Sequence, residues 1–181
     1  MKIKTTNIKG VYLIKPTKFK DNRGFFFESF NEQIFKKKID SKVNFVQDNQ
    51  SLSYKGVLRG LHFQKPPHAQ AKLVSVIKGS VLDVVVDLRK ESKTFGKYII
   101  EELNEYNNHQ LFIPVGMAHG FLTLEDNTIF NYKCSSFYNK ESEDSLLWND
   151  KSLNIKWSNS YPILSKKDGN AKKFTSFVSP F

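Results

Sequence analysis

Short apolar runs separated by turn residues make up most of the 181-residue chain. Ten of them have the length of strands: residues 10–16, 24–30, 44–53, 56–64, 71–79, 80–88, 96–103, 109–116, 120–126 and 128–138. They are rich in β-branched and aromatic residues, which favour extended structure. Their regular spacing is typical of an antiparallel barrel or jelly roll. Residues 74–88 look like a β-hairpin that turns at Lys78–Gly79–Ser80.

Helical patterns are few and short. The clearest is residues 31–39, NEQIFKKKI, and a second covers residues 150–157, DKSLNIKW. The chain contains no internal repeat, linker or low-complexity segment. We therefore expect a single all-β domain over residues 1–181, an antiparallel jelly-roll barrel with a few short helices.

The alternation in residues 128–138 separates two faces. Phe130, Tyr132, Cys134 and Tyr138 share one parity, and polar residues dominate the other. In a barrel the apolar parity should face the interior. This predicts that the Tyr132 hydroxyl lies at or near a cavity, where it needs a hydrogen-bond partner.

The run GVLRGLHFQ, residues 56–64, carries a charge and an imidazole in an apolar context. Arg59 and His62 have opposite parity, so a regular strand would point them to opposite sides. Gly60 lies between them, and a glycine inside a strand often marks a bulge. If Gly60 redirects the strand, both side chains reach one site. Otherwise Arg59 lies on a solvated face and His62 is an ordinary hydrogen-bonded barrel residue.

Charge and cysteine content limit the partners. The formal net charge is +10, which suits an anionic ligand or simply a lysine-rich solvated surface. No RNA-binding signature or zinc-finger spacing occurs, so we expect no nucleic-acid partner.

The single cysteine, Cys134, excludes an intramolecular disulfide and fits a reducing compartment. No stretch has the length of a membrane span, so we expect a cytoplasmic protein without a membrane partner.

Histidines in a barrel raise the question of a metal. The segment PVGMAHG, which ends beside His119, matches the Pro-x-Gly-x-x-His pattern of metal-binding cupins. The companion His-x-His pattern fails, because Phe63 and Gln64 follow His62. Two histidines without a third ligand make a poor transition-metal site. The chain thus resembles a cupin barrel lacking its metal, and we expect no metal and no cofactor. His68 and His109 lie in turn-like segments and are expected at the surface.

Covalent catalysis finds no support in the sequence. Cys134 has the apolar parity of its strand and is interpreted as a buried small hydrophobe. No Gly-x-Ser-x-Gly elbow or phosphate-binding glycine loop occurs. General acid–base chemistry remains, with His62, Tyr132 and either Lys72 or Arg59 as candidates.

Seven segments occur in the order typical of one family. They are DNRGFFFE (21–28), QDNQS (47–51), GVLRGLHFQ (56–64), residues 66–98, GMAHGFLTLEDN (116–127), YKCSSFYNKESE (132–143) and LSKKD (164–168). Through them the chain resembles the dTDP-4-dehydrorhamnose 3,5-epimerase family of cupin-fold sugar-nucleotide epimerases. The resemblance covers nearly the whole chain.

The resemblance implies a role for each matching position. His62 would be the base, oriented by Asp168, and Tyr132 the acid on the opposite face of the sugar. Lys72, helped by Arg59, would stabilise the oxyanion at sugar O4. Asn49 and His119 would line the sugar site. The nucleotide and diphosphate would be bound by Arg23, Phe26, Glu28, Gln47, Tyr138, Glu143 and Lys167. In the family, some of these residues come from the partner subunit of a homodimer.

The implied substrate is a nucleotide-diphosphate 4-keto sugar used in polysaccharide synthesis. Its C3 and C5 protons flank the C4 ketone, so removing either gives an enolate, and a proton returned on the other face inverts the centre. The motifs leave alternatives open: action at C3 or C5 alone, a GDP-linked 4-keto sugar including heptoses, or a 3,4-ketoisomerase. A non-catalytic sugar-nucleotide-binding cupin is the alternative from another functional class.

Overall fold

Two antiparallel sheets form the body of the protein in the computed structural model, which describes residues 1–181. The strands are β1 (Lys2–Thr5), β2 (Tyr12–Lys15), β3 (Phe19–Asp21), β4 (Gly24–Phe26), β5 (Gln47–Ser53), β6 (Leu58–Gln64), β7 (Lys72–Lys78), β8 (Ser80–Asp87), β9 (Tyr98–Asn104), β10 (Gln110–Ile113), β11 (Met117–Thr123), β12 (Thr128–Cys134) and β13 (Glu143–Ser145). The helices are α1 (Glu32–Lys38), α2 (Lys166–Gly169) and the 3₁₀ turn η1 (Phe174–Ser176). None of them is long and apolar enough to cross a membrane.

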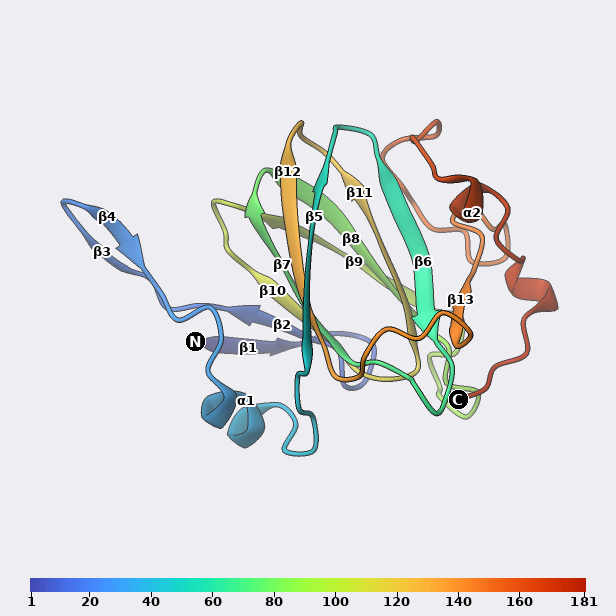
Figure 1. The fold of residues 1–181 in the computed structure, drawn as a ribbon, viewed down its shortest axis with the longest axis horizontal. Helices are drawn as coiled ribbons and strands as arrows, with labels where there is room; N and C mark the ends of the chain where they lie inside the picture. The colour runs from blue at the N-terminus through green and yellow to red at the C-terminus, as the bar shows by residue number, and fades with distance from the viewer.

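Strand order is that of a jelly roll. The six-stranded sheet has the order β1-β2-β10-β7-β12-β5, and the five-stranded sheet has the order β13-β6-β11-β8-β9. Strands β3 and β4 pair only with each other. The two large sheets face each other in Figure 1. The prediction of an all-β jelly-roll barrel with a few short helices is confirmed.

The main core lies between the two sheets. Its buried side chains come alternately from strands of both, as expected for pleated strands that each turn one face inward. They include Val74, Val76, Leu111 and Phe130 from the six-stranded sheet and Val81, Val85, Met117 and Phe121 from the five-stranded sheet. This cluster occupies only part of the space between the sheets.

The C-terminal segment covers the outer face of the five-stranded sheet. Leu61 and Val84, whose side chains point out of the barrel, are fully buried in a cluster with Leu146, and Phe177 and Phe181 pack against it. Phe63 meets Phe177 with ring centroids 5.5 Å apart. This packing carries α2 to the side of β6, as Figure 1 shows.

Helix α1 confirms the first helical prediction and covers part of the six-stranded sheet. Asn31 caps its N-terminus by accepting a hydrogen bond from the Ile34 N–H at 3.1 Å. Phe35 is its buried residue and packs against Phe112 and Leu73. Phe35 is therefore the residue through which α1 packs into the core.

The second predicted helix, at residues 150–157, is wrong. The segment forms turns instead, because the buried Asp150 side chain accepts hydrogen bonds from the backbone N–H groups of Ser152 and Phe174. Asn154 adopts a positive φ of 50°, which a helix does not allow. Asp and Asn side chains that bond nearby backbone groups compete in this way with helix formation.

The predicted hairpin at residues 74–88 is also wrong, although its turn is real. Strand β7 pairs with β10 and β12, whereas β8 pairs with β9 and β11 in the other sheet. Gly79 makes the corner between the sheets at φ 80°, and a Cβ there would collide with the Thr128 hydroxyl. Both strands are mostly apolar, so alternation alone does not tell a hairpin from a passage between sheets.

The parity prediction for residues 128–138 holds only within the strand. Phe130 and Cys134 are buried and Tyr132 packs half-buried against the core. The prediction is wrong for Tyr138, which is 55% exposed, because β12 ends at Cys134 and the chain then leaves the sheet. Alternation carries no information beyond the end of a strand.

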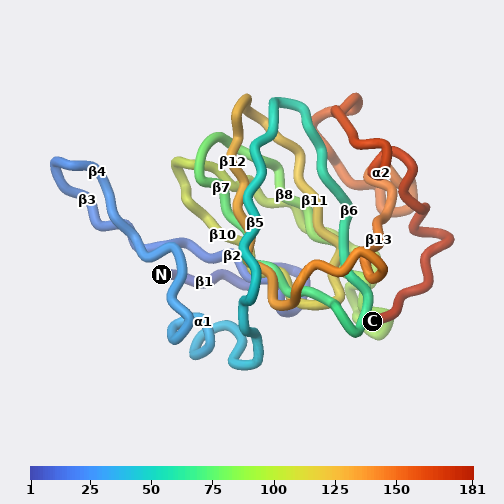
Figure 2. Tube along the Cα trace, viewed as in Figure 1, coloured from blue at the N-terminus to red at the C-terminus, as the bar shows by residue number.

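The β3–β4 hairpin projects from the body of the molecule. In Figures 1 and 2 it extends away from the end that carries β6, β13 and α2. Three of its aromatic side chains are largely exposed: Phe19, Phe25 and Phe26. An isolated two-stranded hairpin has no core of its own, so its apolar side chains have little to pack against.

Candidate active site

A pocket of about 890 Å³, including its open mouth, lies between the two sheets. Eight of the predicted site residues line it: Arg59, His62, Lys72, His119, Tyr132, Glu143, Lys167 and Asp168. They come from β6, β7, β11, β12, β13 and α2. The fold thus brings together residues that are spread over more than half of the chain.

A bulge in β6 brings Arg59 and His62 to the same pocket. In the β6–β11 pairing, His62 lies opposite His119 and Arg59 lies opposite Phe121, so β6 holds one extra residue. Gly60 has a φ of 141°, and a Cβ on it would lie 2.5 Å from the Gly120 Cα. The prediction that the backbone departs from regular strand geometry near Gly60 is confirmed.

His62 forms a close pair with Asp168. Its Nε2 lies 2.5 Å from the Asp168 Oδ1, and the aspartate is 3% exposed. Burial opposes ionisation of this carboxyl group, but the hydrogen bonds and charge of His62 outweigh it, so the pKa of Asp168 is lowered. With Nε2 bonded to the carboxylate, Nδ1 is the ring nitrogen left to accept a proton.

Helix α2 fixes the position of Asp168. Ser165 caps this four-residue helix, and its Oγ accepts a hydrogen bond from the Asp168 N–H at 3.1 Å. The residue before Asp168, Lys167, points its Nζ to the Glu143 Oε1 at 2.6 Å. The short helix therefore supplies both an anion to His62 and a cation at the pocket rim.

Tyr132 stands on the opposing sheet. Burial raises its pKa, so the phenol keeps its proton at neutral pH and can act as a donor. The Lys72 Nζ lies 5.8 Å from the centroid of the Tyr132 ring. Burial lowers the pKa of Lys72, partly offset by negative charge at Asp83 and Glu143. The His62 imidazole thus lies on one wall of the pocket, and the Tyr132 phenol and the Lys72 amine lie on the other.

A second histidine–aspartate pair lies deeper in the barrel. His119 Nε2 is 2.9 Å from the Asp83 Oδ2, and both side chains are buried. Burial raises the pKa of Asp83 and lowers that of His119, which favours a neutral imidazole donating its N–H. Asp83 was missed by the sequence reasoning. Its signal was a carboxyl group on the same parity as Val81 and Val85, in an inward-facing apolar row.

Arg59 is held along the pocket wall by β5. Its Nε donates to the Ser53 Oγ at 3.1 Å, and its guanidinium reaches the Leu52 carbonyl at 3.5 Å. No carboxylate neutralises it. A planar cation held in this way is suited to binding an anionic or carbonyl oxygen.

A second pocket of about 510 Å³ adjoins the first. The two pockets share four lining residues, which are His62, Lys72, Tyr132 and Glu143. The second pocket is also lined by Gln47, Asn49 and Tyr138. The Tyr138 hydroxyl donates to the Glu143 Oε2 at 3.1 Å. Burial raises the pKa of Glu143, but the Lys167 contact outweighs it and the net pKa is lowered. The two pockets form one elongated cleft.

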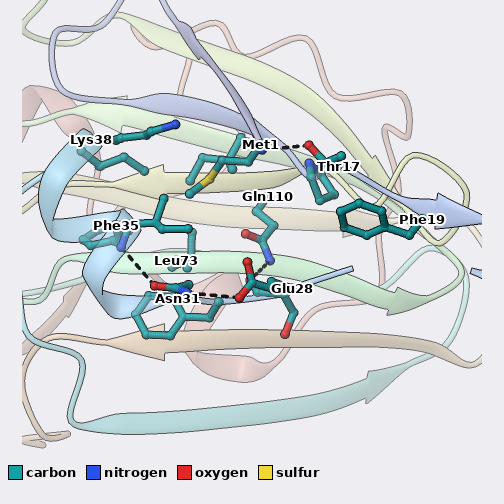
Figure 3. A pocket seen from close by; sticks show the side chains of 15 residues that line it. Met1, Thr17, Phe19, Glu28, Asn31, Phe35, Lys38, Leu73 and Gln110 are labelled. Carbon is teal, nitrogen blue, oxygen red and sulfur yellow. Dashed lines mark hydrogen bonds between the residues drawn. The ribbon is translucent and has the colours of Figure 1, made fainter. Parts of the chain in front are cut away.

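Three predicted binding residues do not reach this cleft within one chain. Arg23 and Phe26 lie on the projecting β3–β4 hairpin, where the Arg23 side chain is 85% exposed and pairs with Asp21. Glu28 accepts a hydrogen bond from the Asn31 Nδ2 in a separate, mainly apolar cleft beside α1, as Figure 3 shows. A single chain therefore leaves these residues apart from the acid–base groups.

The fold and the site together define the class: a cupin-type barrel whose central pocket carries opposed acid–base groups. Comparison with known proteins gives the family. The model of the dTDP-4-dehydrorhamnose 3,5-epimerase family matches residues 5–176. The chain belongs to this family.

Individual relatives agree over nearly the full length. A dTDP-4-dehydrorhamnose 3,5-epimerase of Shigella flexneri is 51% identical over 174 residues, which is 96% of each chain. The crystal structure of an enzyme with the same name from Elizabethkingia anophelis is 51% identical, with a TM-score of 0.93 and 97% of each chain covered. A dTDP-6-deoxy-D-glucose-3,5-epimerase from Legionella pneumophila, solved with dTDP-4-keto-L-rhamnose, is 43% identical with a TM-score of 0.94, covering 98% of this chain and 94% of its own.

Proposed function

We propose that the protein is an isomerase that inverts C3 and C5 of a dTDP-linked 4-keto-6-deoxyhexose. The observation that carries the proposal is the opposed placement of the His62–Asp168 pair and Tyr132 in one pocket. Inversion needs a base on one side of a carbon and an acid on the other. The family and the names of its relatives support the substrate class.

The proposed reaction proceeds by proton transfer alone. His62 removes the proton next to the C4 ketone, and Asp168 stabilises the imidazolium that forms. Lys72 and Arg59 stabilise the negative charge that develops on the enolate oxygen. Tyr132 then delivers a proton to the opposite face of the same carbon. Exchange with solvent then returns a proton to Tyr132 and removes one from His62, and repetition at the second carbon completes the 3,5-inversion without change of oxidation state.

Substrate contacts are proposed along the cleft. His119 lines the pocket of the His62–Asp168 pair, and Asn49 lines the adjoining pocket next to Tyr132; both are proposed to contact the sugar. Gln47 and Tyr138 in the adjoining pocket, with Glu143 and Lys167 where the two pockets meet, are proposed to bind the nucleotide diphosphate. The names of the relatives favour dTDP over a GDP-linked hexose or heptose. The free cysteine, Cys134, is in keeping with the reducing cytoplasm, which we propose as the location.

Solvent exchange tests the function directly. The protein is incubated with dTDP-4-keto-6-deoxyglucose in D₂O, and deuterium at C3 and C5 is followed by NMR. Exchange with inversion at both carbons is expected. Exchange at one carbon alone would identify an enzyme restricted to that carbon, and exchange only with a GDP-linked sugar would change the nucleotide.

Two histidine variants provide a matched pair for this assay. His62→Ala should abolish exchange and keep the fold by circular dichroism, whereas His68→Ala, outside both pockets, should exchange like the wild type. Absence of exchange with every 4-keto sugar nucleotide, despite tight binding, would favour a sugar-nucleotide-binding protein without catalysis.

We further propose a homodimer in which the β3–β4 hairpin of one chain completes the cleft of the other. The exposed aromatic side chains of the hairpin and the distance of Arg23, Phe26 and Glu28 from the pocket support this arrangement. An isologous interface would deliver both hairpins at once.

Hybrid dimers test this proposal. Arg23→Ala and His62→Ala chains are mixed, dissociated and reassociated. One site in each hybrid dimer then combines an intact barrel with an intact hairpin. Because about half of randomly formed dimers are hybrids, the mixture should recover about a quarter of the wild-type activity per site. No recovery, with dimers verified by light scattering, would contradict a shared site.

A further inference from the structure

Ser51 of strand β5 has a hydroxyl group without a partner in the protein. Its Oγ is buried and makes no hydrogen bond with any protein group. The residue nevertheless lines the acid–base pocket with His62 and Tyr132. A buried hydroxyl without a hydrogen bond costs free energy, so such groups are rare in folded proteins and call for an explanation.

Neighbours on the same face of β5 are paired. Asn49 donates from its Nδ2 to the Cys134 Sγ at 3.6 Å and accepts a bond from Gln47. The Ser53 Oγ accepts from the Arg59 Nε. Ser51 lies between them on the strand and is the member of this row left free. The pocket that Ser51 lines is the space from which a ligand can approach this hydroxyl group.

The ladder places Ser51 close to the reacting groups. Strands β5 and β12 pair so that Ser51 lies opposite Phe130 and Asn49 lies opposite Tyr132, which puts Ser51 one inward-facing step from the proposed acid. On its other side, Ser53 anchors the Arg59 guanidinium. Ser51 lines the pocket of the His62–Asp168 pair and not the adjoining pocket of Gln47 and Tyr138. This position corresponds to the sugar end of the cleft.

We propose that Ser51 is a substrate-binding residue whose hydroxyl hydrogen-bonds an oxygen of the sugar ring or its substituents. This inference rests on the proposed function, because that function sets which end of the ligand lies beside His62. A neutral hydroxyl suits a neutral sugar oxygen and leaves the diphosphate to the cations. The cost of the unpaired hydroxyl in the free protein is recovered when the sugar binds.

Two probes and two variants test the inference. Calorimetry measures binding of dTDP-glucose and of dTDP alone to wild type, Ser51→Ala and Thr123→Val. The Thr123 hydroxyl is also buried and unpartnered, but it lies in neither pocket, so it controls for removal of an orphan hydroxyl. Ser51→Ala should weaken dTDP-glucose binding about 2- to 12-fold, the range of one neutral hydrogen bond, and leave dTDP binding unchanged. Thr123→Val should bind both like the wild type.

Thermal unfolding gives the second readout. Both variants should unfold at the same or a higher temperature than the wild type without ligand, because each loses an unsatisfied buried group. Unchanged dTDP-glucose affinity in Ser51→Ala would overturn the inference, as would a lower unfolding temperature, which would assign Ser51 to the fold. If the wild type binds neither probe, the proposed function itself fails, and the two failures are distinguishable.

Discussion

Replacing Asp168 by Asn tests the proposed base most directly. The change keeps the size of a side chain that is 3% exposed, removes its charge and replaces one acceptor oxygen by an NH₂ donor. Asp168 lies 2.5 Å from the His62 Nε2, so the variant loses a charge-assisted hydrogen bond to the imidazolium that forms during proton abstraction. Such bonds contribute about 1.5–3 kcal/mol, which corresponds to about a 10- to 150-fold lower turnover.

The assay is deuterium exchange at C3 and C5 at saturating substrate, where turnover is separated from affinity. Dissociation constants should change little, because Asp168 lies behind His62 and bonds it from the side away from the free Nδ1. Asp144→Asn is the matched control, since Asp144 pairs with Lys172 at 2.7 Å outside both pockets. It should turn over like the wild type. Turnover of Asp168→Asn within twofold of the wild type, with its fold intact, would refute the role of the carboxylate.

Three further predictions concern the acid, the bulge and acid stability. Tyr132→Phe should slow inversion about 10²- to 10⁴-fold, while His62 still exchanges the substrate proton with retention of configuration. NMR separates the two processes, because it reports configuration and deuterium content independently. Parallel loss of inversion and exchange would contradict separate roles for Tyr132 and His62. Gly60→Ala should lower the free energy of unfolding, measured in urea, by about 2–4 kcal/mol, because the new Cβ would strike Gly120. Gly24→Ala is the control, since Gly24 also has a positive φ but a Cβ there would meet no atom within 4 Å. It should lower the free energy of unfolding less. Asp87 has a pKa lowered from 3.8 to about 2: burial opposes ionisation, but hydrogen bonds from Arg89, Ser92 and Thr94 outweigh it. The ionised carboxylate should contribute about 2 kcal/mol to the free energy of unfolding above pH 4, and this contribution should be lost as the pH falls toward 2. Asp87→Asn should therefore be less stable than the wild type at neutral pH, and the difference in unfolding free energy should disappear at pH 2.

The bulge shows how far a local pattern can reach. The opposite parity of Arg59 and His62, with Gly60 between them, already required an irregular strand if both serve one site. The structure adds the reason why glycine stands at this position, since a Cβ on Gly60 would lie 2.5 Å from the Gly120 Cα of β11. Gly60 and Gly120 are far apart in the chain, so the local pattern predicted the irregular strand but could not identify the neighbouring backbone.

The failures have a common origin in long-range packing. The pattern of residues 150–157 is compatible with a helix, but Asp150 bonds the distant Phe174 N–H and holds a turn. The alternation of residues 74–88 is that of two strands, but their partners in different sheets separate them. Short strands such as β1, β3 and β13 escaped notice because three or four residues give too few alternations to detect.

The sequence by itself predicted most strands of the barrel, the helix near residues 31–39 and, through the family resemblance, a set of candidate acid–base residues, because alternation and motif order can be detected in the chain alone. Only the tertiary structure decided which of those residues meet. It brought Asp168 against His62 across 106 residues, a contact that the family resemblance had implied. It also added Asp83 beside His119 and showed that the Ser51 hydroxyl in the same pocket is unpaired. It also separated Arg23 and Phe26 from the cleft. The physical reason is that burial periodicity fixes which side of a strand faces inward, whereas sheet order and the bulge fix which inward side chains share a pocket.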